Sequence, residues 1–135
     1  MDQRRRAFLE DLLDTATPSG FETAGQRVWV DYVESFADEV RTDDYGNAVA
    51  VLEGGDTEVA LAGHGDEIGF LVRDVTEDGM LKLTAVGGSD RTVTKGQHVQ
   101  VHAEGGPVAG VVGQTAIHLR DPEDESVDDI GEQYV

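Results

Sequence analysis

The sequence contains no cysteine and very little lysine, and each scarcity excludes a class of chemistry or of partner. Without cysteine the chain can form no disulfide, no thiolate metal site and no cysteine nucleophile. Acidic residues number 28 against 10 basic ones, of which only Lys82 and Lys95 are lysines, and the formal net charge is −18. A surface of this charge repels the phosphates of nucleic acids and of anionic membranes, so we expect neither as a partner.

Long hydrophobic runs are also missing. The basic start Arg4–Arg6 is followed by only three apolar residues before Glu10 and Asp11, which matches neither a signal peptide nor a membrane span. Acidic residues alternate with short apolar runs along the whole chain, which indicates a folded domain rather than an acidic tail. We therefore predict a cytoplasmic protein. The scarcity of lysine favours a haloarchaeal-like cytoplasm, where molar salt screens the repulsion between acids, over an acidic protein of ordinary origin.

The first part of the sequence predicts two amphipathic helices followed by strands. Apolar residues at helical spacing predict helices over residues 4–14 and 21–37, with Ser19 and Glu22 as a capping box before the second. Turn residues then separate short runs that are typical of strands, at 39–41, 48–52 and 59–63. We expect these strands to form a sheet that the helices cover.

From Ile68 onward the sequence predicts strands alone. The strand-like runs lie at 68–75, 81–86, 99–103 and 108–112. We place a domain boundary between Gly65 and Phe70, which divides the chain into an α/β unit at 1–67 and a β-rich unit at 68–135. The final Gln133–Val135 is predicted to begin a strand without a partner, so we expect the β-rich unit to be incomplete.

His64 and Asp66 are the candidate site residues. They follow an apolar run and stand two residues apart, which places both side chains on the same side of an extended segment. An imidazole at the carboxyl end of a strand can bind a transition metal, and a nearby carboxylate can orient that imidazole. A structural histidine at a strand end is the alternative, because this short spacing also arises by chance.

Several stretches, in one order, resemble a known family. They are Thr17–Glu22, Asp43–Asn47, His64–Phe70, Val86–Gly88, Gly110–Gly113 and His118–Leu119. Across nearly the whole chain this order is similar to the N-terminal part of the TET-type dinuclear metallo-aminopeptidases. Members of that family are called glutamyl or deblocking aminopeptidases and sometimes endoglucanases.

The resemblance implies a fold and a metal site. The expected fold class is α/β, with the N-terminal part of a phosphorylase/hydrolase-like catalytic domain at 1–67 and a small inserted β-barrel-like dimerisation domain at 68–135. The family holds two divalent metal ions, usually zinc or cobalt. His64 matches one metal ligand and Asp66 matches the catalytic acid that orients the site, whereas the remaining ligands and the general base are expected in sequence beyond Val135. Gly65 departs from the family, which commonly has a larger apolar residue there.

The resemblance also implies a reaction and an assembly. We expect the parent protein to remove N-terminal residues from peptides by a metal-activated water, within a homo-oligomer whose dimers assemble into a dodecamer. One histidine and one carboxylate are too few for two metal ions, so we expect no hydrolysis from this chain alone. A non-catalytic remnant that only mediates association is the alternative. A glucan hydrolase ranks last, because adjacent acids in a turn lack the opposed geometry that flanks a sugar ring.

Overall fold

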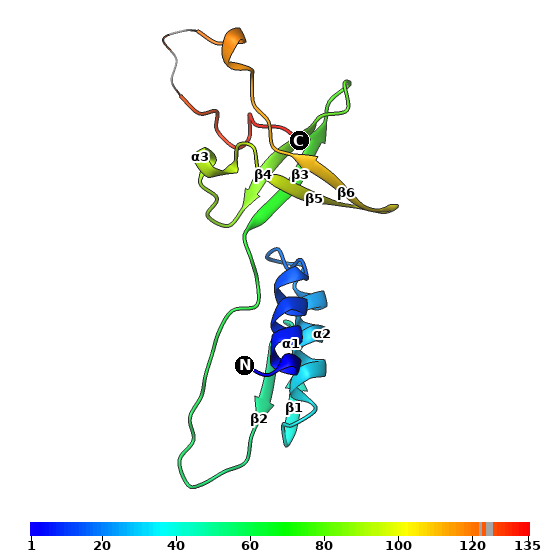
Figure 1. The fold of residues 1–135 in the computed structure, drawn as a ribbon, viewed down its shortest axis with the longest axis vertical. Coiled ribbons are helices and arrows are strands. Elements are labelled where there is room, and N and C mark those ends of the chain that lie inside the picture. Colours follow the sequence, from blue (N-terminus) through cyan, green and yellow to red (C-terminus); the bar gives the residue numbers. More distant parts are fainter. Residues whose placement is uncertain (122, 124–125) are drawn as a thin grey trace. The chain divides into compact units, whose positions relative to one another are not determined.

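The computed structural model describes residues 1–121, 123 and 126–135, which form two compact units, Met1–Glu67 and Ile68–Val135 (Figure 1). The first unit contains two helices and a hairpin, and the second contains two hairpins and short helical turns. The chain is therefore of mixed α and β content. The assignment of the first unit to a catalytic domain and of the second to dimerisation stays a prediction.

Two antiparallel helices form the body of the first unit. Helix α1 spans Gln3–Asp14 and α2 spans Thr23–Val33, which confirms the two predicted helices, although α2 ends at Val33 and not at residue 37. Asp2 caps α1 by accepting a hydrogen bond from the backbone N–H of Arg5 at 2.9 Å. The helices are held together by Phe8, whose ring stacks on that of Tyr32 with the centroids 3.8 Å apart.

The start of α2 differs from the prediction. Its N-cap residue is Glu22, which makes no side-chain capping bond, and the Glu22 carboxylate instead accepts from the backbone N–H of Gly20 at 2.6 Å. The Ser19 hydroxyl donates instead to Asp66. The predicted capping box is therefore wrong, because a long-range carboxylate takes the hydroxyl that would have capped the helix.

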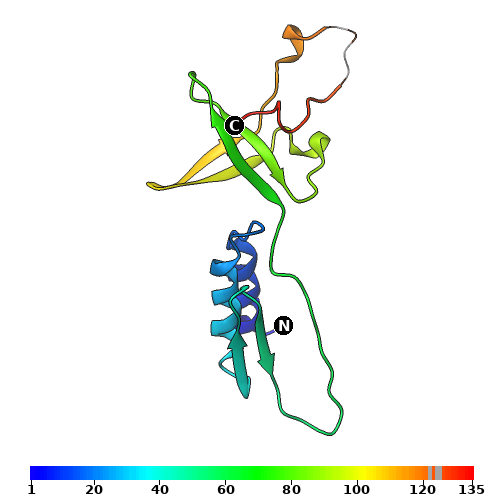
Figure 2. The ribbon, with the colours of Figure 1, turned by 180° about the vertical axis from the view of Figure 1, so that it is seen from behind.

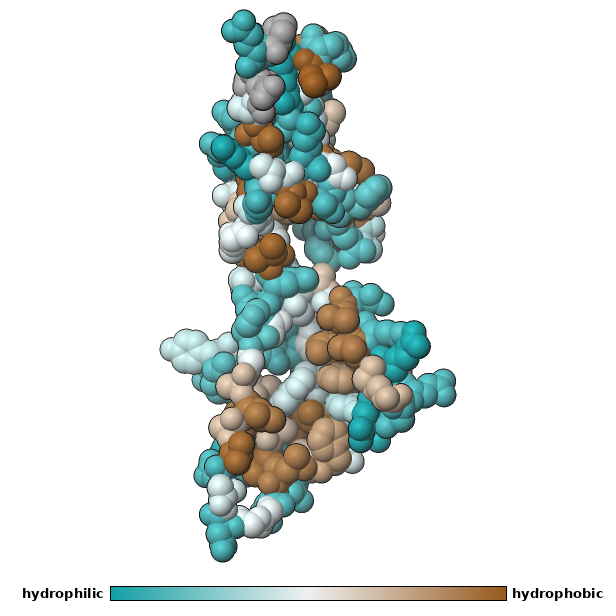
Figure 3. Space-filling model, turned by 60° about the vertical axis from the view of Figure 1, so that its left-hand side comes forward, coloured by the Kyte–Doolittle hydropathy of each residue, from teal (hydrophilic) through white to brown (hydrophobic). Residues whose placement is uncertain are grey.

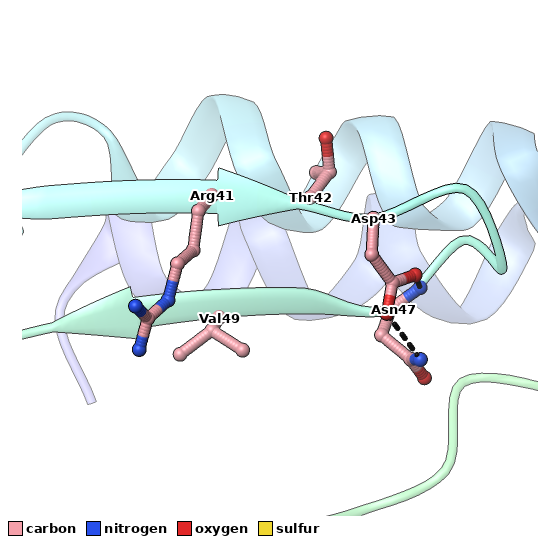
Figure 4. A pocket seen from close by; sticks show the side chains of 5 residues that line it. All are labelled: Arg41, Thr42, Asp43, Asn47 and Val49. Carbon is pink, nitrogen blue, oxygen red and sulfur yellow. Dashed lines mark hydrogen bonds between the residues drawn. The ribbon is translucent and has the colours of Figure 1, made fainter.

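A hairpin covers one side of the helices. Strands β1 (Glu39–Thr42) and β2 (Ala48–Val51) pair antiparallel, with Val40 opposite Ala50 on the half-buried face. The turn between them depends on Asp43, whose carboxylate accepts from the backbone and the side chain of Asn47 at 2.9 and 2.8 Å (Figure 4). These bonds lower the pKa of Asp43, with the side-chain bond from Asn47 as the largest cause.

The predicted strand at 59–63 does not form. Residues 52–66 run as an extended segment that stands apart from the helices and the hairpin for most of its length (Figures 1 and 2). Within the described part of the chain, no backbone group of residues 54–63 has a hydrogen-bond partner, and Val59 and Leu61 are 75% and 96% exposed. A strand needs a neighbour to accept its backbone hydrogen bonds, and none is present here.

The second unit is built from two antiparallel hairpins. Its strands are β3 (Gly69–Val75), β4 (Leu81–Val86), β5 (His98–Ala103) and β6 (Gly106–Val111), which confirms the four predicted strands. Strand β3 pairs with β4 and β5 pairs with β6. The short helix α3 (Arg91–Thr94) and the 3₁₀ turn η1 (Ile117–Leu119) were not predicted, because four and three residues are too few to show a helical period.

The end of the chain connects the two hairpins, contrary to the prediction that it would remain unpaired. Val135 exchanges two backbone hydrogen bonds with Leu81 of β4, at 2.8 and 3.0 Å, and Tyr134 exchanges two with Gly113, at 2.7 and 3.0 Å. The Gln133 side chain is fully buried beside them. The two hairpins still form separate two-stranded sheets in the residues described, so the barrel-like closure stays a prediction.

Few side chains are buried. Among the described residues, the buried hydrophobic side chains are Val33, Leu83 and Val112. Many other hydrophobic side chains are exposed, and Figure 3 shows them gathered in groups on the face that it presents. In the described part of the chain, no helix is long and apolar enough to cross a membrane.

Candidate metal centre

His64 and Asp66 lie in direct contact at the end of the extended segment. The Nδ1 atom of His64 lies 2.9 Å from Oδ1 of Asp66 and 3.0 Å from the Asp66 backbone carbonyl. Since both of these partners are acceptors, Nδ1 carries the proton, and in the neutral form of the ring Nε2 is left bare. The His64 side chain is 86% exposed, and within the described residues its Nε2 has no hydrogen-bond partner. Nε2 is therefore the atom available to bind a metal ion.

Asp66 is held from two sides. Its Oδ1 faces His64, while its Oδ2 accepts a hydrogen bond from the Ser19 hydroxyl. These contacts lower the pKa of Asp66, and the bond from Ser19 is the largest cause, followed by that from His64. Asp66 is thus an acceptor-only carboxylate at neutral pH, as the tautomer of His64 requires.

The loop at residues 17–20 anchors the segment that carries both site residues. The backbone of Glu67 bonds to two residues of this loop: its N–H donates to the Thr17 carbonyl at 2.9 Å, and its carbonyl accepts from the Ser19 N–H at 3.2 Å. The Glu67 carboxylate also accepts from the Thr17 N–H at 2.8 Å. We call this set of three hydrogen bonds the 17–67 clamp. It positions Ser19 beside Asp66.

Helix α2 supports the clamp through a glycine. The Thr17 side chain is buried and lies directly against Gly25, where an added Cβ would overlap the Thr17 methyl group. Gly25 therefore allows the 17–20 loop to approach the helix closely.

The donor set is incomplete. In the described residues, no three His, Asp or Glu side chains lie close enough together to hold a metal ion. His64 suits one ligand position and Asp66 suits a carboxylate that orients it, which agrees with the chemistry of the group that the resemblance implies. The described residues thus supply a candidate ligand and a candidate orienting carboxylate, and no complete metal site.

Other polar residues are kept apart from this pair. His98 and His102 are exposed and alternate with half-buried valines along β5, so they lie on the polar face of that strand. Arg41, Thr42, Asp43, Asn47 and Val49 line a hollow on the hairpin of the first unit (Figure 4). The hollow contains neither His64 nor Asp66.

Sequence reasoning missed the supporting residues. Ser19 was assigned to a helix cap, and Thr17 and Glu67 were given no role. The signal available was the Thr17–Glu22 motif itself, whose residues hold the segment that carries His64 and Asp66 through the 17–67 clamp.

Position 65 is expected to accept a side chain. The backbone φ of Gly65 lies outside the left-handed region, and an added Cβ would lie 3.5 Å from Nε2 of Gln26, which is an ordinary contact. Gly65→Ala is therefore expected to stabilise the first unit by about 0.4–1 kcal/mol, because alanine restricts the unfolded chain. Urea unfolding in molar KCl measures this.

Gly46→Ala is the matched control. Gly46 has a φ of +84°, so alanine there is expected to cost about 1–2 kcal/mol. If Gly65→Ala and Gly46→Ala have the same free energy of unfolding, this account of position 65 is contradicted.

A family model supports the resemblance. The model of the M42 glutamyl aminopeptidase family matches residues 46–135. These residues include His64 and Asp66 and make up two thirds of the chain.

Individual relatives agree with the family model. The lysyl aminopeptidase of Pyrococcus furiosus is 34% identical over 114 residues, which cover 84% of this chain and 33% of that protein. The crystal structure of a TET aminopeptidase from a marine sediment archaeon of the Thaumarchaeota superposes with a TM-score of 0.91 at 28% identity, covering 98% of this chain and 38% of that one.

A third similar protein is the TET1 peptidase of Pyrococcus horikoshii, which can assemble into a tetrahedron or a large octahedral shell. It matches with a TM-score of 0.80 at 30% identity, over 96% of this chain and 39% of that chain. The present chain therefore spans only between a third and two fifths of the length of these three proteins.

Proposed function

Since the chain belongs to the M42 glutamyl aminopeptidase family, we propose that it forms the N-terminal part of a metal-dependent aminopeptidase. The reaction is removal of N-terminal residues from peptides by hydrolysis. The observation that carries the proposal is the His64–Asp66 pair, which holds Nε2 of His64 bare and exposed within a segment that the family model matches.

His64 and Asp66 have distinct roles in this proposal. His64 would hold one of two divalent ions, zinc or cobalt, through its Nε2 lone pair. Asp66 keeps the proton on Nδ1 and fixes the direction of the ring. A bound ion would polarise the peptide carbonyl and lower the pKa of the attacking water. The other ligands and the general base are assigned to the part of the enzyme that this chain does not contain.

The proposed partners are further copies of the chain. We assign residues 68–135 to a β-barrel-like dimerisation domain and propose that the dimers assemble into a dodecamer. The assembly of the similar TET1 peptidase supports this, as do exposed hydrophobic side chains in the second unit, among them Leu71, Val93, Val108 and Val111. The even spread of acidic residues supports a salt-loaded cytoplasm as the location.

Two alternatives remain as outcomes of the tests. A non-catalytic remnant that only associates is consistent with the incomplete donor set of the described residues. A glucan hydrolase receives no support from Asp43, because its carboxylate is engaged in the turn by Tyr45 and Asn47.

Calorimetric titration with zinc tests the proposal. The chain extended through its genomic reading frame is expected to bind two zinc ions, whereas the 135-residue chain binds zinc only weakly, through His64. His64→Ala is expected to abolish the weak binding, and His102→Ala, which removes an exposed histidine from β5, is expected to leave it unchanged.

If the extended protein does not bind zinc with useful affinity, the proposal of a metal-dependent aminopeptidase is contradicted and the non-catalytic remnant is favoured. Equal loss of binding in the two histidine variants would show nonspecific surface coordination and would overturn the assignment of His64.

A further inference from the structure

We propose that Ser19 is a positioning residue for the metal ligand, acting on His64 through Asp66. The Ser19 hydroxyl donates to Oδ2 of Asp66, and Oδ1 of the same carboxylate receives the Nδ1 proton of His64. We call this chain of contacts the Ser19–Asp66–His64 relay. The effect of the relay on metal binding rests on the proposed function, whereas its effect on the tautomer of His64 does not.

The backbone holds Ser19 in place. Its N–H donates to the Glu67 carbonyl at 3.2 Å, and the Phe21 N–H donates to the Pro18 carbonyl at 2.8 Å, which closes the turn around Ser19. The next residue, Gly20, has a φ of +93°, a conformation that other residues rarely adopt. A half-buried serine fixed in this way presents its hydroxyl in a defined direction.

His64 depends on Asp66 for its orientation. Within the described residues, every hydrogen bond of the His64 ring is made to Asp66, at the carboxylate and at the backbone carbonyl. The Asp66 side chain is 37% exposed, so without a second contact its carboxylate can turn toward water. Ser19 supplies that second contact, because a carboxylate held at both oxygens cannot rotate away from the imidazole.

A purely structural role for Ser19 predicts different results. A helix cap would stabilise α2, but the N-cap of α2 is Glu22 and the Ser19 hydroxyl donates to Asp66. Removal of the hydroxyl is therefore expected to change the state of the His64 ring while the helical content stays the same.

The test is nitrogen-15 NMR of the His64 side chain in the metal-free 135-residue chain, at a pH where the nitrogen-15 shifts themselves show that the ring is neutral. The wild-type chain is expected to show the tautomer protonated at Nδ1. Ser19→Ala is expected to shift the ring toward the mixture of tautomers found in free histidine, and Asp66→Asn is expected to do the same. Ser19→Thr retains the hydroxyl, so this variant is expected to show the same tautomer as the wild-type chain.

Ser35→Ala is the matched control. It removes a serine hydroxyl of the same unit, and this hydroxyl donates to the Tyr32 carbonyl and is not connected to the relay. This variant is expected to keep the wild-type tautomer. Circular dichroism identifies any variant that has lost the fold. If Ser19→Ala loses it, Ser19→Thr decides the question, since a folded threonine variant with the free-histidine mixture overturns the proposal.

A second readout separates the relay from the proposed function. In the extended protein, Ser19→Ala is expected to weaken zinc binding about 10–100-fold, the usual effect of losing a group that orients a ligand. An unchanged tautomer in folded Ser19→Ala overturns the relay, whatever the zinc affinity. A changed tautomer with unchanged zinc affinity supports the relay but contradicts the role of His64 as a metal ligand.

Discussion

Replacing His64 by alanine in the extended enzyme is expected to lower kcat/KM by about a thousandfold or more. A lost ligand removes several kcal/mol of transition-state stabilisation from a metal-assisted hydrolysis, and about 1.4 kcal/mol corresponds to each factor of ten. Asp66→Asn is expected to cost less, about 10–100-fold, because the ligand remains while its orientation is lost. Rates on aminoacyl chromogenic amides in molar KCl with added zinc or cobalt measure both effects.

The control for these variants is His102→Ala, which changes an exposed histidine on β5 and is expected to leave kcat/KM unchanged. The order of the effects is as informative as their size. An Asp66→Asn variant that loses more activity than His64→Ala would show that Asp66 takes part directly in the chemistry, and the division of roles proposed for the pair would then be wrong.

Gly25→Ala is expected to destabilise the first unit by about 1–3 kcal/mol, even though alanine is the better helix former by about 1 kcal/mol. The added Cβ would overlap the buried Thr17 side chain, so either the 17–20 loop or α2 must move. The 17–67 clamp includes Thr17, so the same change is expected to loosen Asp66. Urea unfolding followed by circular dichroism measures the loss.

Two companion variants isolate the steric cause. Ala24→Gly, at the exposed neighbouring position of α2, is expected to lower the free energy of unfolding by about 1 kcal/mol through helix propensity alone. Position 24 is thus expected to favour alanine, whereas position 25 favours glycine. Adding Thr17→Ser to Gly25→Ala removes the methyl group in conflict and is expected to recover most of the stability. Equal effects of Gly25→Ala with and without Thr17→Ser would disprove the overlap.

The elements that could be predicted from the sequence are those formed by local contacts. The helices at 4–14 and 21–37 were recognised from apolar residues at helical spacing, and the structure places α1 and α2 within one or two residues of their predicted starts. The hairpins of the second unit were recognised from alternating residues on either side of turn residues. Both patterns depend on neighbours close in the chain, so they persist without the rest of the fold.

The errors concern contacts between distant residues. The run at 59–63 has the composition of a buried strand, but strand formation requires a partner that the described residues do not supply. Ser19 lies at a typical capping position, yet it bonds to Asp66, 47 residues away. Gln133–Val135 has no neighbour in sequence with which to pair, and it pairs with β4 and Gly113. Patterns in the sequence carry no information about which of several possible partners a polar group selects.

The candidate site could be located from the sequence, but its support could not. The two-residue spacing of His64 and Asp66 predicted side chains on the same side of the segment, and the structure brings them into contact at 2.9 Å. Their roles as ligand and orienting acid stay predictions. The exposed Leu61 and Val59, which precede the site, are what we expect if, as proposed, further sequence of the enzyme supplies both the neighbouring strands and the other ligands.

The measurement that tests the central claim most directly is aminopeptidase activity of two proteins side by side, this 135-residue chain and the chain extended through its reading frame, in molar KCl with added zinc or cobalt. The account predicts hydrolysis by the extended protein alone, because no three His, Asp or Glu side chains lie close enough together in the described residues of the short chain to hold a metal ion. Hydrolysis by the short chain that disappears in His64→Ala would contradict the account and would show that another subunit supplies the missing ligands.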